Sequence, residues 1–377
     1  MPRLLMWCQH ALGLGHLVRS YALAAGLAER FDVVLVVGGH LPDEITPPPG
    51  VRIVPLPAVA AEDGDWAAVS ADRGLMRART NALLAAFDEH RPDVLVLELF
   101  PFGRKRFTGE LVSLLMQAHG VDGRRPLVAC SVRDILVGAR RDQPRHDRRA
   151  RFMADRWFDM VLVHGDPAFA LFADTFPEPL AIPVHHTGFV VAPRPAPESR
   201  ASGRLVVASA GGGAVGEPLL TAALQAQAML ADEGFTLRAI AGPLLSPEGF
   251  SRLEKLAAAT PGAELIRVVP DLPSVLAQAA VSVSQCGYNT LLEVVGAGVP
   301  AIMVPYRAGR EDEQHRRADR LAALGAVSVL SAEGLDPATL ADSIRARCGQ
   351  PVMPVALEVD GAARSTELLE VAIGVPA

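Results

Sequence analysis

Three polar side chains with complementary chemistry, Thr290, Glu293 and Gln314, fall within one stretch of alternating strand and helix patterns, residues 281–326. A helix beginning at Asn289 or Thr290 offers free backbone N–H groups and the positive end of its dipole, which together favour a phosphate. Glu293 follows three residues later on the same helix face, where a carboxylate can accept from paired ribose hydroxyls. These residue types indicate a crevice for a nucleotide diphosphate attached to a sugar.

Two turns and a loop must position these side chains. Gly287 ends the strand Ala280–Ser284, and Asp312 and Gln314 follow the next buried strand, Ala301–Pro305. In open α/β sheets, ligands bind outside the carboxyl ends of the strands. Taken singly, a Thr near a helix start is commonly a cap and a Glu there a partner of the helix dipole. Their grouping in one strand–helix–strand–loop unit favours the binding interpretation.

A second motif, Gly13-Leu14-Gly15-His16-Leu17-Val18-Arg19, follows the first predicted strand, Leu4–Cys8. The two glycines allow a tight turn and the close approach of a ligand. A helix N-terminus disfavours imidazolium, so His16 is predicted to be neutral and to serve as a general base. The alternative is a histidine that caps or packs. Arg19 either binds an anionic group or faces solvent.

Charged residues follow three other predicted strands at the same sheet edge. Glu98 and Arg104 lie after one strand, Arg133 and Asp134 after the next, and Asp166 after a third. The same rule predicts that they line the acceptor side of a site, with Glu98 and Asp166 as further candidates for general base. The alternative interpretation is local ion pairing of Glu98 with Arg104 and of Arg133 with Asp134.

The stretch at 281–326 resembles the donor-binding region of family 28 glycosyltransferases, the group that contains MurG. The residues that carry the resemblance are Gln285–Gly287, Thr290, Glu293, Gly296, Gly298, Pro300, Pro305, Asp312, Gln314 and Ala326. It implies that Thr290 contacts the diphosphate, Glu293 the ribose and Gln314 the sugar hydroxyls. The run Cys286-Gly287-Tyr288-Asn289 and His315 depart from the family pattern, so the sugar identity stays open.

The resemblance extends weakly over the chain and assigns further roles. The His16 loop is similar to the acceptor-side loop of the family and to the catalytic-histidine loop of sugar-nucleotide hydrolases. Gly211–Gly216 fits GxGxxG, but the next strand ends in Gly242-Pro243 without the acidic residue of a dinucleotide site. The resemblance instead implies a diphosphate-facing turn and a contact with the nucleotide base. The residues concerned are Ser209, Gly212 and Gly213 for the turn, and Val268 and Val269 for the base.

Composition and patterning predict an α/β protein of GT-B type, with two Rossmann-like βαβ domains and a cleft between them. The domains are expected at 1–198 and 199–377, on either side of a proline-rich linker, and the resemblance implies that the last helix, Glu367–Ala372, crosses back. The net charge of −6 argues against a general nucleic-acid partner. Four dispersed cysteines favour a reducing cytoplasm, and no apolar run approaches the roughly 18 residues of a membrane helix.

The sequence thus predicts a bacterial, cytoplasmic glycosyltransferase of hexosyl or N-acetylhexosaminyl type. It would use a nucleotide-diphosphate sugar, UDP-linked by preference, invert the anomeric centre and need no metal or other cofactor. Asp63-x-Asp65 resembles a metal motif of other transferases but follows no buried strand. The alternatives are a hydrolase in which His16 activates water and a non-catalytic sugar-nucleotide-binding protein. The arginine-rich segment Arg133–Arg156 is either a solvated face or a peripheral contact with the inner membrane face.

Overall fold

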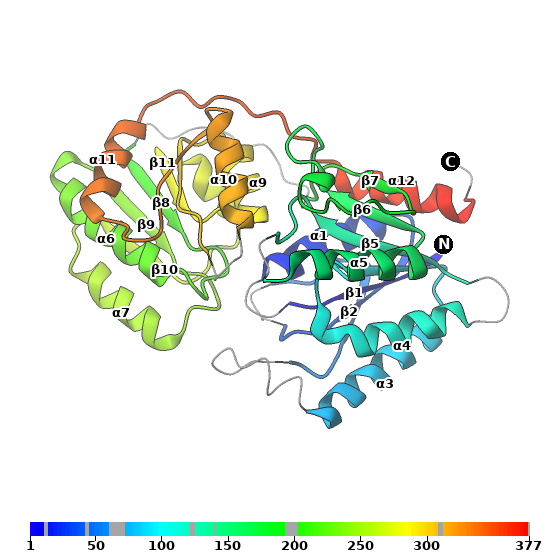
Figure 1. Cartoon of the computed structure of the whole chain (residues 1–377). Coiled ribbons are helices and arrows are strands. Elements are labelled where there is room, and N and C mark those ends of the chain that lie inside the picture. Colours follow the sequence, from blue (N-terminus) through cyan, green and yellow to red (C-terminus); the bar gives the residue numbers. More distant parts are fainter. Residues whose placement is uncertain are drawn as a thin grey trace. The chain divides into compact units, whose positions relative to one another are not determined.

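A computed structural model describes residues 1–10, 14–41, 45–59, 72–120, 125–138, 141–192, 203–307 and 312–375. The chain divides into two compact units (Figure 1). The first contains Met1–Ala192 and Leu357–Ala377, and the second contains Pro193–Ala356. The predicted linker at 193–203 falls almost entirely outside the described residues, as do Gly13 and the Asp63-x-Asp65 motif. Each unit has its own sheet and its own core.

The sheet of the first unit has seven parallel strands in the order β3-β2-β1-β4-β5-β6-β7. Near-continuous apolar runs, mostly of Val and Leu, form the central strands, as expected where helices cover both faces of a parallel sheet. The strands are β1 (Arg3–Cys8), β2 (Asp32–Val37), β3 (Val51–Pro55), β4 (Val94–Glu98), β5 (Leu127–Arg133), β6 (Met160–His164) and β7 (Val184–His186).

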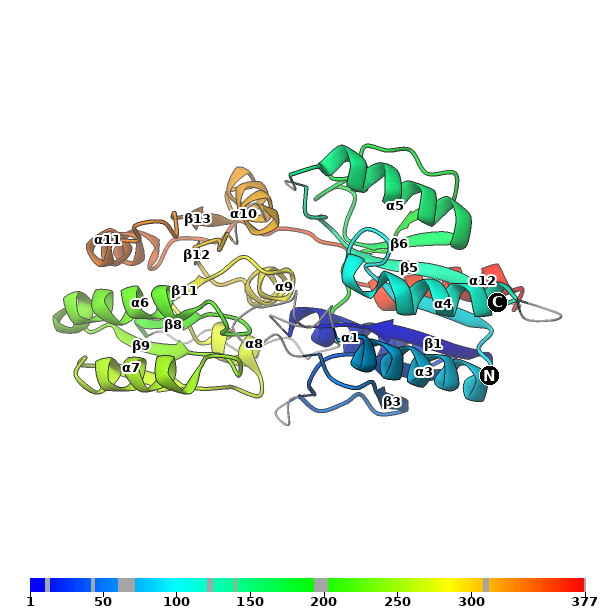
Figure 2. The same cartoon turned by 60° about the horizontal axis from the view of Figure 1, so that its bottom comes forward.

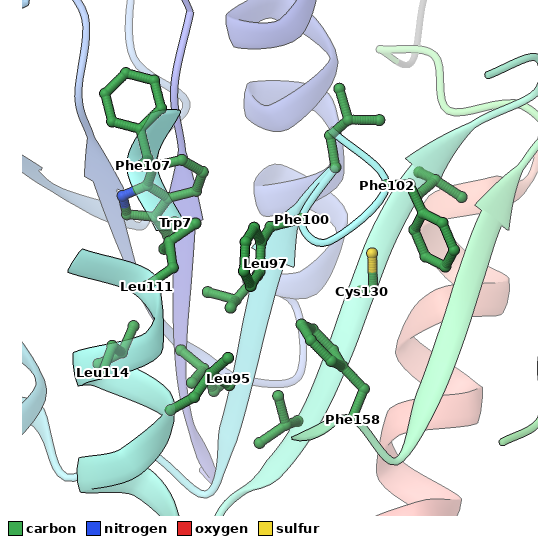
Figure 3. Close-up of a cluster of buried hydrophobic side chains, with 14 of the residues drawn as sticks. Trp7, Leu95, Leu97, Phe100, Phe102, Phe107, Leu111, Leu114, Cys130 and Phe158 are labelled. Atoms are coloured by element: carbon green, nitrogen blue, oxygen red, sulfur yellow. The ribbon is translucent and has the colours of Figure 1, made fainter. Parts of the chain in front are cut away.

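Helices cover both faces of this sheet. The helical elements of the unit are α1 (Gly15–Leu27), α3 (Arg73–His90), η2 (Lys105–Phe107), α4 (Thr108–His119), α5 (Gln143–Trp157), η3 (Phe172–Asp174) and α12 (Gly361–Ile373). Side chains of α3, α4 and α5 share one apolar cluster with the sheet. In Figure 3, Trp7 of β1 lies beside Phe107 and Leu111, and Leu95 and Leu97 of β4 lie in the same layer. This core fixes the strand ends that carry the candidate side chains.

The last helix belongs to the first unit. The last helix crosses back as expected, and the returning segment that packs with the first unit, Leu357–Ala377, begins before that helix. Helix α12 lies against α1 (Figure 1). A Cβ atom at Gly26 of α1 would stand 2.6 Å from the Cβ of Ala362, so the glycine permits this close contact. A single antiparallel bridge joins Val190 to Asp360 where the chain leaves the unit and returns.

The second unit is built on a six-stranded parallel sheet in the order β10-β9-β8-β11-β12-β13. Its strands are β8 (Leu205–Ser209), β9 (Thr236–Ile240), β10 (Ala263–Ile266), β11 (Val281–Ser284), β12 (Ala301–Met303) and β13 (Val327–Val329). Its helical elements are α6 (Glu217–Leu230), η4 (Ala231–Glu233), α7 (Pro247–Ala258), α8 (Leu272–Ala277), α9 (Tyr288–Ala297), α10 (Glu313–Ala323) and α11 (Pro337–Arg347). Helix α6 packs with α7 and α11, and α8 packs with α9 (Figure 2).

Candidate functional site

The strand order of the second unit reverses between β8 and β11, which are neighbours in the sheet. The chain leaves these two strands in opposite directions, so a crevice forms at their carboxyl ends. The predicted phosphate loop, Gly211–Gly213, follows β8, and the turn Gln285–Gly287 follows β11. The structure therefore brings the two predicted phosphate-facing segments together at the switch point of the sheet.

The loop after β8 needs its glycines. Gly211 has a φ of +60° and Gly213 a φ of +90°, in the left-handed region that other residues rarely adopt. A Cβ atom at Gly213 would collide with the backbone of Ala241 and Gly242, on the loop after β9. Ser209 ends β8 and is buried, and its hydroxyl accepts a bond from the Gly211 N–H at 3.4 Å. The backbone of this loop can thus approach a ligand without an intervening side chain.

Helix α9 (Tyr288–Ala297) starts earlier than predicted, because its N-cap is Gly287 and not Asn289 or Thr290. Gly287 has no side chain that could cap the first turn, and neither Asn289 nor Thr290 has the predicted capping role. Thr290 lies within that turn, buried, and its hydroxyl faces the positions where Cβ atoms of Gly211 and Gly287 would stand, 3.8 Å from each. The backbone N–H groups of the first turn, the dipole and this hydroxyl form a site suited to an anion. Glu293 is half-buried one turn later.

Gln314, expected to bind sugar hydroxyls, makes two other contacts in the structure. Its Oε1 accepts from the backbone N–H of Cys286 at 3.1 Å and of Tyr306 at 3.0 Å. Only the Nε2 amide is then left to donate to a ligand. Asp312, at the start of α10, has an Oδ1 that is buried without a hydrogen-bond partner in the described part of the chain. Arg317, which sequence reasoning missed, is fully buried and donates from Nη1 to the carbonyl of Cys286 at 2.9 Å.

A cavity of about 400 Å³ opens beside this crevice within the second unit. Most of its wall is aliphatic, and its polar lining includes Gln285, His315 and Glu333. The Nδ1 of His315 is buried and has no hydrogen-bond partner among the described residues. Val268 and Val269, predicted to lie near a nucleotide base, follow β10 at the opposite edge of the sheet and are half-buried.

The first unit also has a switch point, between β1 and β4, and Glu98 ends β4 there. Glu98 is fully buried. Its Oε1 accepts from His16 Nδ1 at 2.6 Å and from Arg19 Nη2 at 2.5 Å. Its Oε2 accepts from Arg104 Nη2 at 3.2 Å and from Arg104 Nε at 3.3 Å. The four side chains, predicted separately from two loops, form one cluster.

The charges of this cluster follow from its burial. Burial lowers the pKa of His16 from 6.5 to about 3, although the Glu98 carboxylate opposes the shift. Burial also opposes ionisation of Glu98, but His16, Arg104 and Arg19 outweigh it and hold the pKa of that carboxyl below its usual range. Glu98 is therefore a carboxylate and His16 a neutral imidazole. Because a carboxylate only accepts, the proton of His16 lies on Nδ1 and its Nε2 can accept one.

The segment after β4 holds an uncommon backbone. Leu99 has a φ of +64° and Arg104 a φ of +57°. Such conformations cost about 1–3 kcal/mol for residues other than glycine and cluster at functional sites. Here they turn the chain so that Arg104 reaches back to Glu98. The predicted ion pair of these two residues is therefore present, and it belongs to the His16 cluster.

The other predicted residues of this unit lie apart from that cluster or at its margin. Asp166 accepts from the N–H of Ala168 at 2.7 Å through Oδ1 and from the N–H of Glu358 at 3.1 Å through Oδ2. These bonds attach the returning segment to the sheet. They explain why a buried carboxylate is tolerated at Asp166, so its burial does not indicate a catalytic base. Arg133, half-buried at the end of β5, lies near enough to His16 to lower its pKa. Gly15 opens α1, which has no side-chain cap.

Helix α5 carries most of the arginine-rich segment. The arginines exposed on it are Arg145, Arg148, Arg149, Arg151 and Arg156. Phe152 stands among them with 65% of its surface exposed. Arg151 forms ion pairs with Asp155 at 3.6 Å and Glu178 at 3.4 Å. We call this exposed surface of α5 the α5 face.

Among the described residues, no group of three or more His, Cys, Asp or Glu side chains is placed to bind a metal ion. Within the same ranges, no helix combines the length and apolarity needed to cross a membrane.

The second unit is similar in sequence to a known protein family. Residues 206–350 match the glycosyltransferase family 28 C-terminal domain. In its second unit, the chain is family 28-like. The resemblance predicted from residues 281–326 is thereby confirmed.

Two curated relatives share one name, UDP-N-acetylglucosamine–N-acetylmuramyl-(pentapeptide) pyrophosphoryl-undecaprenol N-acetylglucosamine transferase. The protein from Methylococcus capsulatus is 30% identical over 140 residues, which are 37% of this chain and 39% of the relative. The protein from an Exiguobacterium species is 31% identical over 96 residues, 26% of this chain and 27% of the relative. The chain thus spans well under half the length of these relatives.

Solved structures resemble the whole chain. The calicheamicin glycosyltransferase CalG4 has a TM-score of 0.59 at 20% identity, covering 99% of this chain and 95% of its own. The spinosyn rhamnosyltransferase SpnG, solved with thymidine diphosphate, has a TM-score of 0.58 at 18% identity, covering 98% and 96%. Identities this low show the fold alone. The predicted GT-B class, with two Rossmann-like units, is confirmed.

Proposed function

We propose that this chain is a nucleotide-sugar-dependent glycosyltransferase that moves a hexosyl or N-acetylhexosaminyl group to an acceptor hydroxyl. The observation that carries the proposal is the pairing of two switch-point sites on one GT-B chain. One, in the second unit, suits a diphosphate, and the other, in the first, holds a neutral histidine on a buried carboxylate. The family 28-like second unit supports the choice of donor.

The second unit would bind the donor. The first turn of α9, the Thr290 hydroxyl and the backbone of Gly211–Gly213 would stabilise the charge that develops on the departing nucleoside diphosphate. Glu293 would accept from the ribose hydroxyls, and the Nε2 amide of Gln314 would donate to the sugar. Because backbone groups and a helix dipole supply this stabilisation, we propose that transfer needs no metal ion.

The first unit would activate the acceptor. His16 Nε2 would take the proton of the acceptor hydroxyl as its oxygen attacks the anomeric carbon on the face opposite the leaving diphosphate, which inverts that centre. Glu98 would hold the ring through Nδ1 and stabilise the imidazolium that forms, as the acidic member of a hydrolase triad does. Glu98, predicted as an alternative base, is thus proposed to be the partner of the base, while Arg19 and Arg104 hold Glu98 in place.

The decisive experiment is a two-stage panel on the full chain. Binding of UDP, thymidine diphosphate and other nucleoside diphosphates is measured first by thermal shift and calorimetry, since names of similar proteins include both nucleotides. Turnover of the matching nucleotide sugars is then followed with and without acceptor mixtures. Binding of none of these nucleotides would contradict the donor site, and release of free sugar at full rate without an acceptor would indicate hydrolysis instead.

His16→Ala tests the base within the same panel. We expect transfer to fall about 100- to 10,000-fold, while affinity for the diphosphate is unchanged, because the histidine lies in the other unit from the diphosphate site. His40→Ala, which alters an exposed histidine of the first unit, is the matched control. Full turnover by the His16 variant would remove it from the mechanism.

We also propose that the α5 face contacts an anionic membrane surface. Its arginines supply positive charge, and the exposed Phe152 supplies an apolar anchor. Co-sedimentation with phosphatidylglycerol vesicles is expected and should weaken with salt and in Phe152→Ala, whereas phosphatidylcholine vesicles should not bind. Equal binding of the protein to both vesicles, or to neither, would contradict it. The cytoplasmic location remains a prediction.

A further inference from the structure

The peptide groups around Cys286 are held from both sides by one helix. The N–H of Cys286 donates to Gln314 Oε1 at 3.1 Å, and its carbonyl accepts from Arg317 Nη1 at 2.9 Å. Gln314 and Arg317 are three residues apart on α10, so they share one face of that helix. Helix α10 thus fixes the two peptide planes on either side of Cys286. We call this pair of contacts the α10 clamp.

The clamp acts on the backbone that precedes the α9 N-terminus. Cys286 is followed directly by Gly287, the N-cap of α9, which has no side chain of its own to hold the first turn of α9. The direction of the first N–H groups of α9 therefore depends on how this turn is held. Thr290 lies in the same helical turn, so its hydroxyl moves with them.

Holding the turn with Arg317 requires the burial of a charged side chain. Its side chain is fully buried, and burying a guanidinium requires hydrogen-bonded partners to offset lost hydration. The bond to Cys286 accounts for one such partner. Gln314 extends the connection, because its Oε1 also accepts from the Tyr306 N–H at 3.0 Å, on the loop after β12. One amide oxygen therefore joins the turn after β11 to the loop after β12.

We infer that Gln314 and Arg317 are positioning residues that set the geometry of the diphosphate site through the backbone of Cys286. The inference rests on the proposed function. It gives Gln314 a second task besides contact with the sugar, and it makes α10 the element on which the phosphate turn depends. Neither side chain needs to touch the diphosphate for this effect.

A ligand-free measurement tests the clamp itself. Amide hydrogen exchange is followed in the peptide that spans Ser284 to Thr290, in the full chain and in Arg317→Met. We expect faster exchange in the variant, because the turn loses the bond that fixes its carbonyl. Arg320→Met, which alters an exposed arginine one turn later on the same helix, should leave exchange unchanged. Unchanged exchange in Arg317→Met would overturn the inference whatever the protein binds.

A binding cycle tests the consequence, with UDP or thymidine diphosphate as probe. Arg317→Met is expected to weaken diphosphate binding about tenfold or more, and Arg317→Lys, which keeps one donor, to recover most of it. In a Thr290→Ala background the same Arg317→Met change should cost much less, because both residues act through one turn. If the double variant lost affinity by the product of the two single losses, Arg317 would have a general structural role, and the positioning role would be overturned.

The outcomes separate this inference from the proposed function. If the unsubstituted protein binds neither diphosphate, the proposed donor site fails, while the exchange experiment still decides the clamp. If the unsubstituted protein binds and Arg317→Met binds equally well, only the positioning role fails. Should Arg317→Met fold poorly, Gln314→Leu provides the same two measurements. Gln314→Leu should speed amide exchange at Cys286 and weaken binding of the diphosphate. If neither changed, the α10 clamp would be contradicted.

Discussion

His164 provides a direct test of how burial sets charge in the first unit. It ends β6, is fully buried, and lies between two hydroxyls. Its Nε2 is 2.8 Å from Ser131 Oγ, and its Nδ1 is 2.9 Å from Thr187 Oγ1. Burial lowers the pKa of His164 from 6.5 to about 3. The imidazole is therefore neutral in the folded protein over the whole range in which an unfolded chain would protonate it.

The sign and size of the effect follow from proton linkage. Below pH 6.5 the unfolded state takes up a proton that the folded state does not, so the free energy of unfolding falls as the pH falls. Each such histidine contributes up to about 1.4 kcal/mol per pH unit, and roughly 1.6 kcal/mol between pH 6.5, where the unfolded histidine is half protonated, and pH 5. Burial likewise lowers the pKa of His10 to about 4 and of His16 to about 3, so they add in the same direction.

The protein supplies its own probe for this measurement. Its three tryptophans, Trp7, Trp66 and Trp157, all precede residue 192, so tryptophan fluorescence reports unfolding of the first unit. Urea unfolding is recorded from about pH 7 to pH 5 for the unsubstituted chain, for His164→Gln and for the control His185→Gln, at a half-buried site of β7. We expect His164→Gln to flatten the pH dependence by about one proton, and the control to match the unsubstituted chain. Equal slopes in all three proteins would refute the reasoning.

Three further predictions use the same protein. Thr290→Ala should weaken nucleoside diphosphate binding by about 10- to 150-fold in calorimetry, because a hydroxyl bond to a charged group is lost, and Thr290→Ser should bind nearly as the unsubstituted protein does. Glu110→Gln should lower the free energy of unfolding of the first unit in urea by about 3–5 kcal/mol. Arg79 is fully buried and donates to both Glu110 oxygens at 2.9 Å, so it would lose its counter-charge. A loss below about 1 kcal/mol would contradict this. Chelation with EDTA should leave sugar transfer unchanged in a coupled assay of diphosphate release, and restoration of a lost rate by added Mg²⁺ would count against the metal-free proposal.

The fold could be predicted because the central strands are short, continuous apolar runs that alternate with helical patterns. Two strands of the first unit gave no such signal. Strand β3 at Val51–Pro55 is only half-buried along its length, and β7 at Val184–His186 has three residues, two of them histidines. Both lie at the edges of the sheet, where one neighbour is missing and burial no longer selects apolar residues.

The sequence predicted single residues of the candidate site better than the contacts between them. His16 and Glu98 are 82 residues apart in the sequence. They form a hydrogen bond only because β1 and β4 are adjacent strands of the sheet. For Arg317 a signal did exist. With Ala318 and Leu321 it occupies the buried positions of α10, in a helix otherwise rich in charge. An arginine at an apolar-stripe position of a polar helix is unusual enough to mark an interior contact.

The return of the C-terminal segment to the first unit has a consequence for how the chain assembles. A chain made from its N-terminus presents Pro193–Ala356 as one uninterrupted piece, so the second unit can complete itself during synthesis. The first unit cannot, because the helix that covers α1 and the strand segment that bridges to Val190 are made last. The unit that begins to fold first is therefore the one that finishes last, and a chain truncated before residue 357 would leave α1 uncovered.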